Sequence, residues 1–365
     1  MTKSVVLVLA CSLLSATGAI RAQEAVPQAT AAPMPWTIGP RALPVPAGAS
    51  DALRGSLMRV PPPDVAGHVR DAPATAEDWA RLLDQASDSS GDRTRAFAKA
   101  WSTTISEDEI AGVTVRTVTP PTVDPANKNR LFVHLHGGAY VFGSGVAGAS
   151  EAIMIARYSK MPVLSIDYRM PPAHPFPAAL DDVIAVWRSL LKDRKASSLA
   201  LGGSSAGGGL VLAVTQELQD LGLDLPGALW AGSPWADLTK TGDSQFINEG
   251  IDRMLVTYDG ILAEAAKLYA GGRDLRTPLI SPVYGEFEGF PPTYLVTGTR
   301  DLFLSHTARV HRKLRAAGVI ADLNVYEGMS HLDFMVELHS PESQEVYGAL
   351  GVFLTQHLEE PVAPR

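Results

Sequence analysis

The stretch that most constrains the fold runs from Leu199 to Leu212 and reads LALGGSSAGGGLVL. Two apolar runs flank a corner of small residues, which predicts a buried strand that turns sharply into a helix. The corner GSSAG fits the G-x-S-x-G pattern of a nucleophile elbow, with Ser205 at its tip. Such a corner strains the serine backbone and needs tiny residues two positions to either side, here Gly203 and Gly207. We therefore predict that Ser205 is a nucleophile.

A glycine- and serine-rich corner could also be a plain loop or a phosphate cradle. A phosphate-binding P-loop needs a lysine followed by serine or threonine after its last glycine. The stretch from Leu199 to Leu212 contains no lysine, so its sequence does not fit that alternative.

The composition limits the classes of function. The chain has 365 residues, enough for one large domain with an extra subdomain or for two domains. Apolar residues make up 46% and charged residues 19%, which is typical of a well-buried core. A net charge of −8 without a basic cluster argues against binding to nucleic acid or to an anionic membrane.

Residues 1–22 resemble a secretory signal peptide, with Lys3 followed by an apolar stretch and then small residues. The apolar stretch is shorter than the roughly 20 residues of a membrane-spanning helix, so we expect cleavage before Gln23 rather than an anchor. Cleavage would remove Lys3 and Arg21 and change the net charge from −8 to about −10. The chain is thus predicted to be secreted or periplasmic, with no stable membrane insertion after cleavage.

Cys11 is the only cysteine, and it lies within the predicted signal peptide. The mature protein would therefore need no disulfides and would tolerate an oxidising compartment. A thiol nucleophile and a cysteine metal site are excluded after cleavage.

The rest of the chain divides by pattern into three parts. Residues 23–50 are rich in alanine and proline and predict a flexible leader. Residues 51–110 predict a helical cap segment, with one helix opening at Thr75 and a second over Arg93–Trp101. Their faces could cover a catalytic mouth or simply pack outside the sheet. No strand is expected before Val113.

Residues 111–360 predict the catalytic domain, in which short β-branched runs alternate with amphipathic helices. This alternation is typical of an α/β fold with a mostly parallel sheet covered on both faces. Residues 240–270 interrupt it and could add to the cap. The expected strands are Val113–Val118, Leu131–Leu135, Val163–Asp167, Leu199–Gly203, Ala228–Ser233, Thr293–Thr299 and Asp322–Tyr326. The expected helices are Ala149–Tyr158, Ala178–Leu191, Ala206–Leu221 and Ser305–Ala317.

Ligands bind at the carboxyl ends of strands in open α/β sheets, so reactive groups are expected just after strands. His136-Gly137-Gly138-Ala139-Tyr140 follows one such strand and is similar to the H-G-G-G motif whose amides stabilise an oxyanion. We assign the oxyanion donors to the backbone N–H groups of Gly138, Ala139 and Ala206. The pair His134 and His136 could instead bind a metal, but too few ligands of the right type follow.

Two further strand ends carry an acid and a base. Asp301 follows the strand at Thr293, and His331 follows the strand at Asp322. We predict that His331 takes the proton of Ser205 and that Asp301 orients the imidazole. Glu327 and Asp333, which flank the histidine, are the alternatives for the acid.

With these residues, the chain resembles an α/β-hydrolase of the hormone-sensitive lipase family, the bacterial family IV esterases, from about Val113 to Leu354. The matching segments are HGGAY, SIDYRMPPAHPFPAALDD, GSSAGG, SPWADLT, the dipeptide RD at Arg300–Asp301, and GMSH. The resemblance implies a central sheet of about eight strands and a helical cap built partly from the N-terminus. It also implies catalysis without a cofactor or a metal.

The chain departs from the family pattern at three places. Ala139 replaces the third oxyanion glycine, Ser204 precedes the nucleophile, and Asp301 is followed by LFLS rather than the frequent P-L-x-D. Four residues that also match the family are interpreted as buried polar struts: Asp167, Tyr168, Arg169 and Asp182.

The resemblance implies a serine carboxylesterase that acts on small-molecule esters of short to medium acyl chains. A lactonase or amide hydrolase using the same triad is the alternative. A non-catalytic binding protein is a third interpretation, as in the plant gibberellin receptor, which lacks the catalytic histidine; here His331 is present. We expect a monomer or a homodimer.

Overall fold

The computed structural model describes residues 37, 39–40 and 42–359, without the side chains of residues 87–89. The chain divides into two units, Met1–Pro44 and Val45–Arg365, of which the second is compact over its described residues. The second unit holds every helix and strand described below. The predicted signal peptide, residues 1–22, and the leader as far as residue 36 lie outside the described residues.

An eight-stranded sheet forms the centre of the second unit, with strand order β1-β2-β4-β3-β5-β6-β7-β8. The strands β3 to β8 all run parallel to one another, whereas β2 is antiparallel to both of its neighbours, β1 and β4. The mostly parallel sheet of about eight strands is thus confirmed. The strands are β1 Thr104–Ile110, β2 Val113–Thr119, β3 Leu131–Leu135, β4 Val163–Ile166, β5 Leu199–Ser204, β6 Ala228–Gly232, β7 Thr293–Gly298 and β8 Ala321–Tyr326.

The parallel register places the loops of interest at one edge of the sheet. Leu135 at the end of β3 is opposite Gly203 of β5, and Gly298 at the end of β7 is opposite Tyr326 of β8. The carboxyl ends of these four strands therefore meet, as ligand sites in open α/β sheets require.

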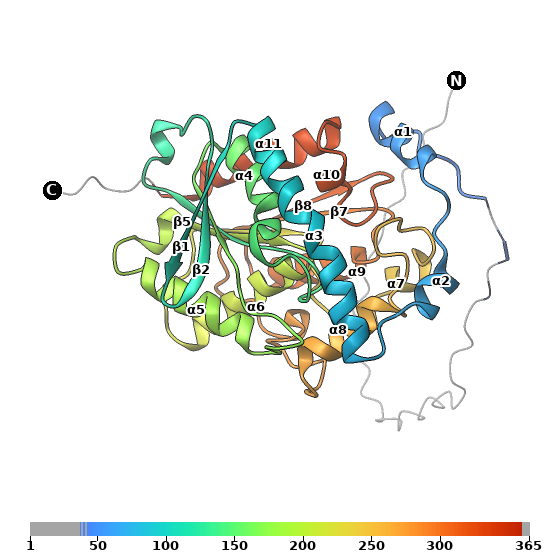
Figure 1. The fold of residues 1–365 in the computed structure, drawn as a ribbon. Helices are drawn as coiled ribbons and strands as arrows, with labels where there is room; N and C mark the ends of the chain where they lie inside the picture. Colours follow the sequence, from blue (N-terminus) through green and yellow to red (C-terminus); the bar gives the residue numbers. More distant parts are fainter. Residues whose placement is uncertain (1–36, 38, 41, 360–365) are drawn as a thin grey trace, which may run out of the picture. The chain divides into compact units, whose positions relative to one another are not determined.

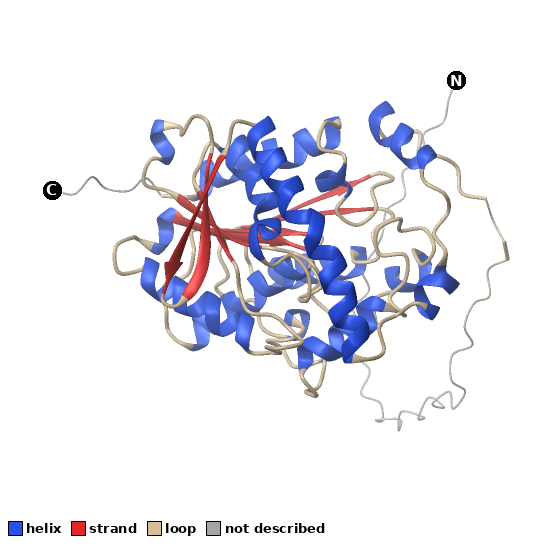
Figure 2. Ribbon diagram, viewed as in Figure 1, coloured by secondary structure: helices blue, strands red, loops and turns tan. Residues whose placement is uncertain are grey.

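Helices cover both faces of the sheet (Figures 1 and 2). One core, built on β3, β5 and β6, packs against α5, α6, α8 and α9. The other core packs mainly against α4 and α11. The helices are α1 Asp51–Arg59, α2 Val65–Arg70, α3 Ala76–Ala100, α4 Ser150–Ser159, α5 Ala178–Leu190, α6 Ala206–Asp220, α7 Ser244–Ile247, α8 Ile261–Ala270, α9 Leu304–Ala316, α10 Asp333–Val336 and α11 Pro341–His357. The short 3-10 helices are η1 Pro125–Asn127, η2 Gly145–Ala149, η3 Ala196–Ser198 and η4 Pro282–Tyr284.

The structure corrects the sequence-based prediction in the N-terminal part. The expectation that no strand precedes Val113 is wrong, because β1 pairs with β2 over its full length. Its sequence TISEDEI is largely polar and exposed, and an edge strand is held by backbone hydrogen bonds that need no apolar pattern. The two expected helices form the single helix α3, which begins with a capping box of Thr75 and Asp78. Its middle contains glycine and several serines, whose weak helix propensity suggested a break.

The helix α11, over Pro341–His357, was not expected. Its apolar residues are spread so evenly that the amphipathic pattern is weak. Within the ranges that the structure describes, no helix is both long and apolar enough to cross a membrane.

Candidate active site

Ser205 stands at the corner between β5 and α6, as the motif predicts. Its backbone has φ 59° and ψ −125°, a strained conformation for a residue with a side chain. A Cβ atom added at Gly203 or at Gly207 would lie 2.0 Å from the carbonyl oxygen of Leu135. The two glycines are therefore required because the end of β3 passes against the corner, in addition to the packing of α6 on β5.

His331 and Asp301 lie in line with Ser205. The Nε2 atom of His331 is 2.9 Å from the Oγ atom of Ser205, and its Nδ1 atom is 3.1 Å from the Oδ1 atom of Asp301. All three side chains are at least nine-tenths buried. The structure thus brings together the three residues that the sequence selected.

Asp301 is held in its ionised form. Burial by itself raises the pKa of Asp301, but the interactions with His331 and a hydrogen bond from the N–H of Phe303 outweigh burial, so the pKa lies below its ordinary value. Its other carboxylate oxygen accepts a hydrogen bond of 2.8 Å from the hydroxyl of Thr297. The carboxylate is therefore fixed on both oxygens.

The two alternative acids have other partners. Glu327 accepts a hydrogen bond from the N–H of Gly48. Asp333 is paired with Arg253, at 2.9 Å from its Nε atom, and accepts the N–H of Ser330. Asp301 is the acid that contacts the His331 ring.

The loop after β3 lies against the elbow. A Cβ added at Gly137 would be 2.9 Å from the carbonyl oxygen of Ser204 and 3.3 Å from the Cβ of Ser205. Gly138, Ala139 and Tyr140 all have positive φ angles, 115°, 52° and 62°, so the chain curls sharply here. The proposed donors Gly138 and Ala139 therefore belong to a curled segment beside Ser205, and Ala206 is the first residue of α6.

The side chain of His136 packs against Tyr168 and hydrogen-bonds within the loop after β3. It stacks on Tyr168 with ring centroids 4.2 Å apart, and the Tyr168 hydroxyl donates a 2.6 Å hydrogen bond to the His136 carbonyl. Burial lowers the pKa of His136 to about 4, so the ring is neutral near pH 7 and its Nδ1–H donates to the carbonyl of Gly137.

His134 has different partners from His136. Its Nδ1 atom is 3.0 Å from the hydroxyl of Ser165, and its Nε2 atom is 3.2 Å from the carboxylate of Glu151. Within the described part of the chain, no three His, Cys, Asp or Glu side chains are grouped so as to hold a metal ion.

A family model described as the alpha/beta hydrolase fold matches residues 132–335, which is more than half of the chain. The chain belongs to this family. The matched range includes the loop after β3 and the three hydrogen-bonded residues Ser205, His331 and Asp301.

This α/β-hydrolase is similar to solved structures of esterases. The crystal structure of an esterase named E25 is 51% identical, with a TM-score of 0.87, and the match covers 89% of this chain and 99% of that one. An esterase from the bacterial hormone-sensitive lipase family is 30% identical, with a TM-score of 0.67, over 85% of this chain and 99% of that one. These matches confirm the resemblance to that family.

A curated relative supports the same relationship. An acetyl-hydrolase of Streptomyces hygroscopicus is 33% identical over 244 residues, which are 66% of this chain and 81% of that protein.

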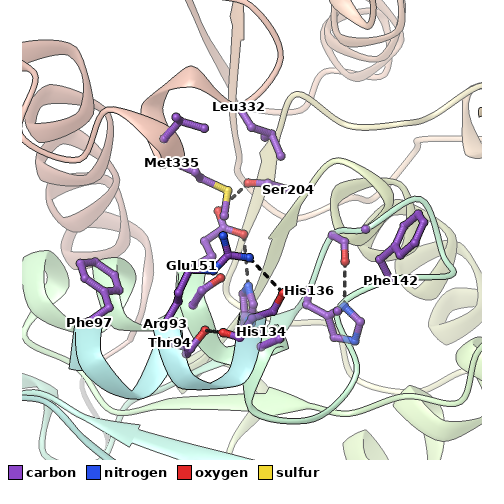
Figure 3. Close-up of a pocket in the computed structure, with 18 of the residues that line it drawn as sticks. Arg93, Thr94, Phe97, His134, His136, Phe142, Glu151, Ser204, Leu332 and Met335 are labelled. Carbon is purple, nitrogen blue, oxygen red and sulfur yellow. Dashed lines mark hydrogen bonds and ion pairs between the residues drawn. The ribbon is translucent and has the colours of Figure 1, made fainter. Parts of the chain in front are cut away.

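A cavity of about 620 Å³ is lined by Ser204 and Leu332, which are the sequence neighbours of Ser205 and His331 in the α/β-hydrolase (Figure 3). It runs between α3, the loop after β3 and α10, and it includes the backbone of Gly137 and Gly138. Its apolar wall comprises Phe97, Phe142, Leu332, Met335, Val336 and Leu338. At its polar end, the carboxylate of Glu151 lies between His134 and the hydroxyl of Ser204, the latter at 2.5 Å.

The four residues interpreted as polar struts are held by ion pairs and hydrogen bonds. Asp167 pairs with Arg116 at 2.8 Å and accepts the N–H of Gly145, and Arg169 pairs with Asp182 at 2.7 Å. The prediction that all four are buried is wrong for two of them: Asp167 is only partly buried, and Arg169 is half exposed because its guanidinium reaches Asp182 from the surface.

Sequence reasoning missed Asp252, which lies in the segment between α7 and α8. Its side chain is fully buried and accepts hydrogen bonds from the backbone N–H groups of Leu302 and His331. No local signal marks it, since one acidic residue in a polar stretch is normally on the surface.

Proposed function

We propose that the chain is a serine carboxylesterase that cleaves carboxylic esters of short to medium acyl chain through an acyl-enzyme. The observation that carries this proposal is the hydrogen-bonded line from Ser205 through His331 to Asp301, at 2.9 and 3.1 Å. Nucleophile, base and orienting acid within hydrogen-bond reach are the requirement for an activated serine. The esterase names of its relatives support ester hydrolysis.

In the proposed mechanism, the Ser205 hydroxyl attacks the ester carbonyl carbon while His331 Nε2 takes its proton. The carbonyl oxygen becomes an oxyanion, which the N–H groups of Gly138, Ala139 and Ala206 stabilise. Each such donor typically contributes about 3 kcal/mol to the transition state. His331 then donates the proton to the leaving alcohol, and a water deprotonated by His331 releases the acid from Ser205.

Asp301 has two tasks in this sequence. Its hydrogen bond to Nδ1 keeps Nε2 free to accept a proton, and its charge stabilises the imidazolium that forms. The downward shift in the pKa of Asp301 supports both tasks, because the carboxylate stays ionised across the neutral range.

The cavity beside Gly137 and Gly138 supports a small substrate. Its volume of about 620 Å³ is within the range of roughly 300–1,000 Å³ that is usual for small-molecule sites. Phe97, Phe142 and Leu332 offer apolar contacts, while Glu151 and His134 add polar groups to the lining. The limited volume of the cavity supports short and medium acyl chains rather than long ones.

The test is hydrolysis of aryl esters of increasing acyl length by the purified protein, alongside Ser205→Ala and a panel of lactones. We expect turnover at short chains and a loss of at least about a thousandfold in the variant, with an unchanged fold by circular dichroism. Retention of more than about a thousandth of the turnover would contradict the assignment of Ser205. Lactone opening far faster than ester cleavage would replace the esterase by a lactonase that uses the same residues.

We also propose that the chain is exported to the periplasm or beyond, on the basis of the sequence of residues 1–22. N-terminal sequencing of the protein from a secreting host should begin near Gln23. An intact Met1 on the cell-associated protein would contradict this proposal.

A further inference from the structure

The side chain of Asp252 is enclosed between two loops and its own turn. One oxygen, Oδ2, accepts the N–H of Leu302 at 2.9 Å and that of His331 at 3.3 Å. The other oxygen, Oδ1, accepts the N–H groups of Met254 at 2.8 Å and Leu255 at 3.1 Å. Four backbone donors thus converge on one carboxylate with no exposed surface.

The two donors on Oδ2 belong to the loops that carry the proposed acid and base. Leu302 directly follows Asp301 after β7, and His331 itself follows β8. A single carboxylate oxygen therefore joins these loops, which lie about thirty positions apart in the sequence. Displacement of Asp252 would alter the spacing of Asp301 and His331.

The next residue, Arg253, anchors the same segment. Its Nε donates to Asp333 at 2.9 Å, its Nη1 donates to the hydroxyl of Ser56 at 2.6 Å, and its N–H donates to the Ser330 hydroxyl at 3.2 Å. Ser56 lies on α1 and Asp333 begins α10. Arg253 therefore attaches the turn that carries Asp252 to Ser330 and Asp333, which lie on either side of His331 in the sequence.

The charges around His331 come from three elements. Asp301 is on the loop after β7, Asp252 is in the segment between α7 and α8, and His306 is on α9. Burial and the nearby Asp301 raise the pKa of Asp252 to about 6, while the charge of His331 opposes this shift. The pKa of His306 is lowered to about 4 by burial, so His306 is neutral at pH 8. At that pH both carboxylates are ionised: Asp301 contacts the His331 ring and Asp252 accepts the His331 backbone N–H, while the Arg253–Asp333 pair nearby is neutral overall.

We propose that Asp252 is a positioning residue for the hydrolase: it holds the loops of Asp301 and His331 in register, and its negative charge stabilises His331 when His331 carries the proton. The proposal rests on the proposed serine mechanism, since it assigns a role in proton transfer to His331. It adds a second carboxylate, besides Asp301, to the histidine side of the site, by which we mean the loops that carry Asp301 and His331.

The experiment measures kcat, KM and the pH profile of kcat/KM for Asp252→Asn, which removes the charge and replaces one of the two accepting oxygens by an NH₂ group. We expect kcat to fall by about a hundredfold with KM nearly constant, because small displacements of reacting groups cost about that much. We also expect the midpoint of the acidic limb to move to lower pH by about half a unit to one unit, because a negative charge that favours protonated His331 is lost.

Two variants separate charge from structure. Asp252→Glu keeps the charge but lengthens the side chain, so we expect a lower kcat with the midpoint of the wild type. Asp237→Asn is a control at a second fully buried carboxylate, which pairs with Arg309 and accepts hydrogen bonds from Thr239, Thr241 and Tyr284. This carboxylate does not bond either loop's backbone, so the variant should lose thermal stability and keep the midpoint.

A midpoint that stays in place in Asp252→Asn, or one that shifts equally in Asp237→Asn, overturns the proposal. If Asp252→Asn gives no folded protein, Asp252→Glu decides: a lowered kcat at the wild-type midpoint supports the role, and an unchanged kcat or a shifted midpoint refutes it. Ser205→Ala is assayed in parallel, so a wild type without serine-dependent turnover marks failure of the proposed function instead.

Discussion

The two sides of the candidate active site are built differently. On the serine side, the backbone sets the geometry: Gly203 and Gly207 admit the end of β3, and the N–H of Ser205 bonds the carbonyl of Gly232 at 2.8 Å. On the histidine side, side chains set much of it. Asp252 bonds both loops there, and the hydroxyl of Thr299 accepts the N–H of Gly328 at 2.9 Å.

The difference explains which side could be read from the sequence. A close approach of backbone to backbone requires glycine, and glycines at fixed spacing make a recognisable motif. A side chain that reaches across from another segment leaves no such spacing. The histidine side does contain one glycine that a close backbone approach requires. A Cβ added at Gly298 would lie 2.0 Å from the carbonyl oxygen of Met329.

The largest expected effect breaks the serine side. Gly207→Ala would place a Cβ against the Leu135 carbonyl oxygen and the His136 backbone, where neither neighbour can move away easily. We expect little or no folded protein, measured as soluble yield and thermal melting. The control is Gly348→Ala on α11, where no described residue lies within 4 Å of the added Cβ. It should raise stability by roughly 0.5–1 kcal/mol, and a normal yield and melting temperature for Gly207→Ala would refute the backbone account.

The next effect tests the acid on the histidine side. Asp301→Asn should lower kcat by about 10⁴-fold, because the amide favours the wrong imidazole tautomer and cannot stabilise the imidazolium. The measurement is steady-state kinetics on a short-chain aryl ester, with the fold checked by circular dichroism. Glu327→Gln, a neighbouring acid that contacts Gly48, should change kcat less than about threefold. If Glu327→Gln lowered kcat more than Asp301→Asn did, Glu327 rather than Asp301 would be the acid that orients His331.

The smallest effect sharpens the account of charge on the histidine side. His306 is fully buried on α9, and neither ring nitrogen has a hydrogen-bond partner among the described residues. Burial lowers its pKa from 6.5 to about 4, so the unfolded chain binds a proton that the folded chain does not between these values. Above pH 6.5, His306 therefore does not change the free energy of unfolding. As the pH falls from 6.5 toward 4, His306 lowers that free energy by up to about 3 kcal/mol.

His306→Leu should remove that contribution, so its melting temperature should fall less steeply between pH 6.5 and pH 4 than that of the wild type. Thermal melts across this range measure the difference. His68→Gln, at an exposed histidine of α2, should follow the wild type. Parallel curves for His306→Leu and the wild type would show that the buried imidazole does not contribute.

Much of the fold followed from periodicity. Buried parallel strands such as β3 and β5 are short apolar runs, and their positions agreed with prediction to within a residue or two. The edge strand β1 and the continuous helix α3 did not follow, since backbone pairing and helix caps can hold segments whose side chains favour neither state.

The sequence by itself determined the elbow at Ser205, the glycine loop after β3, and the candidates Asp301 and His331, because each is a local pattern at the end of a strand. Only the tertiary structure decided that Asp301, rather than Glu327 or Asp333, contacts the histidine. It alone also revealed the place of Asp252 between their loops. The physical reason is that local motifs encode backbone shape, whereas contacts between distant segments depend on how the whole sheet and its loops pack.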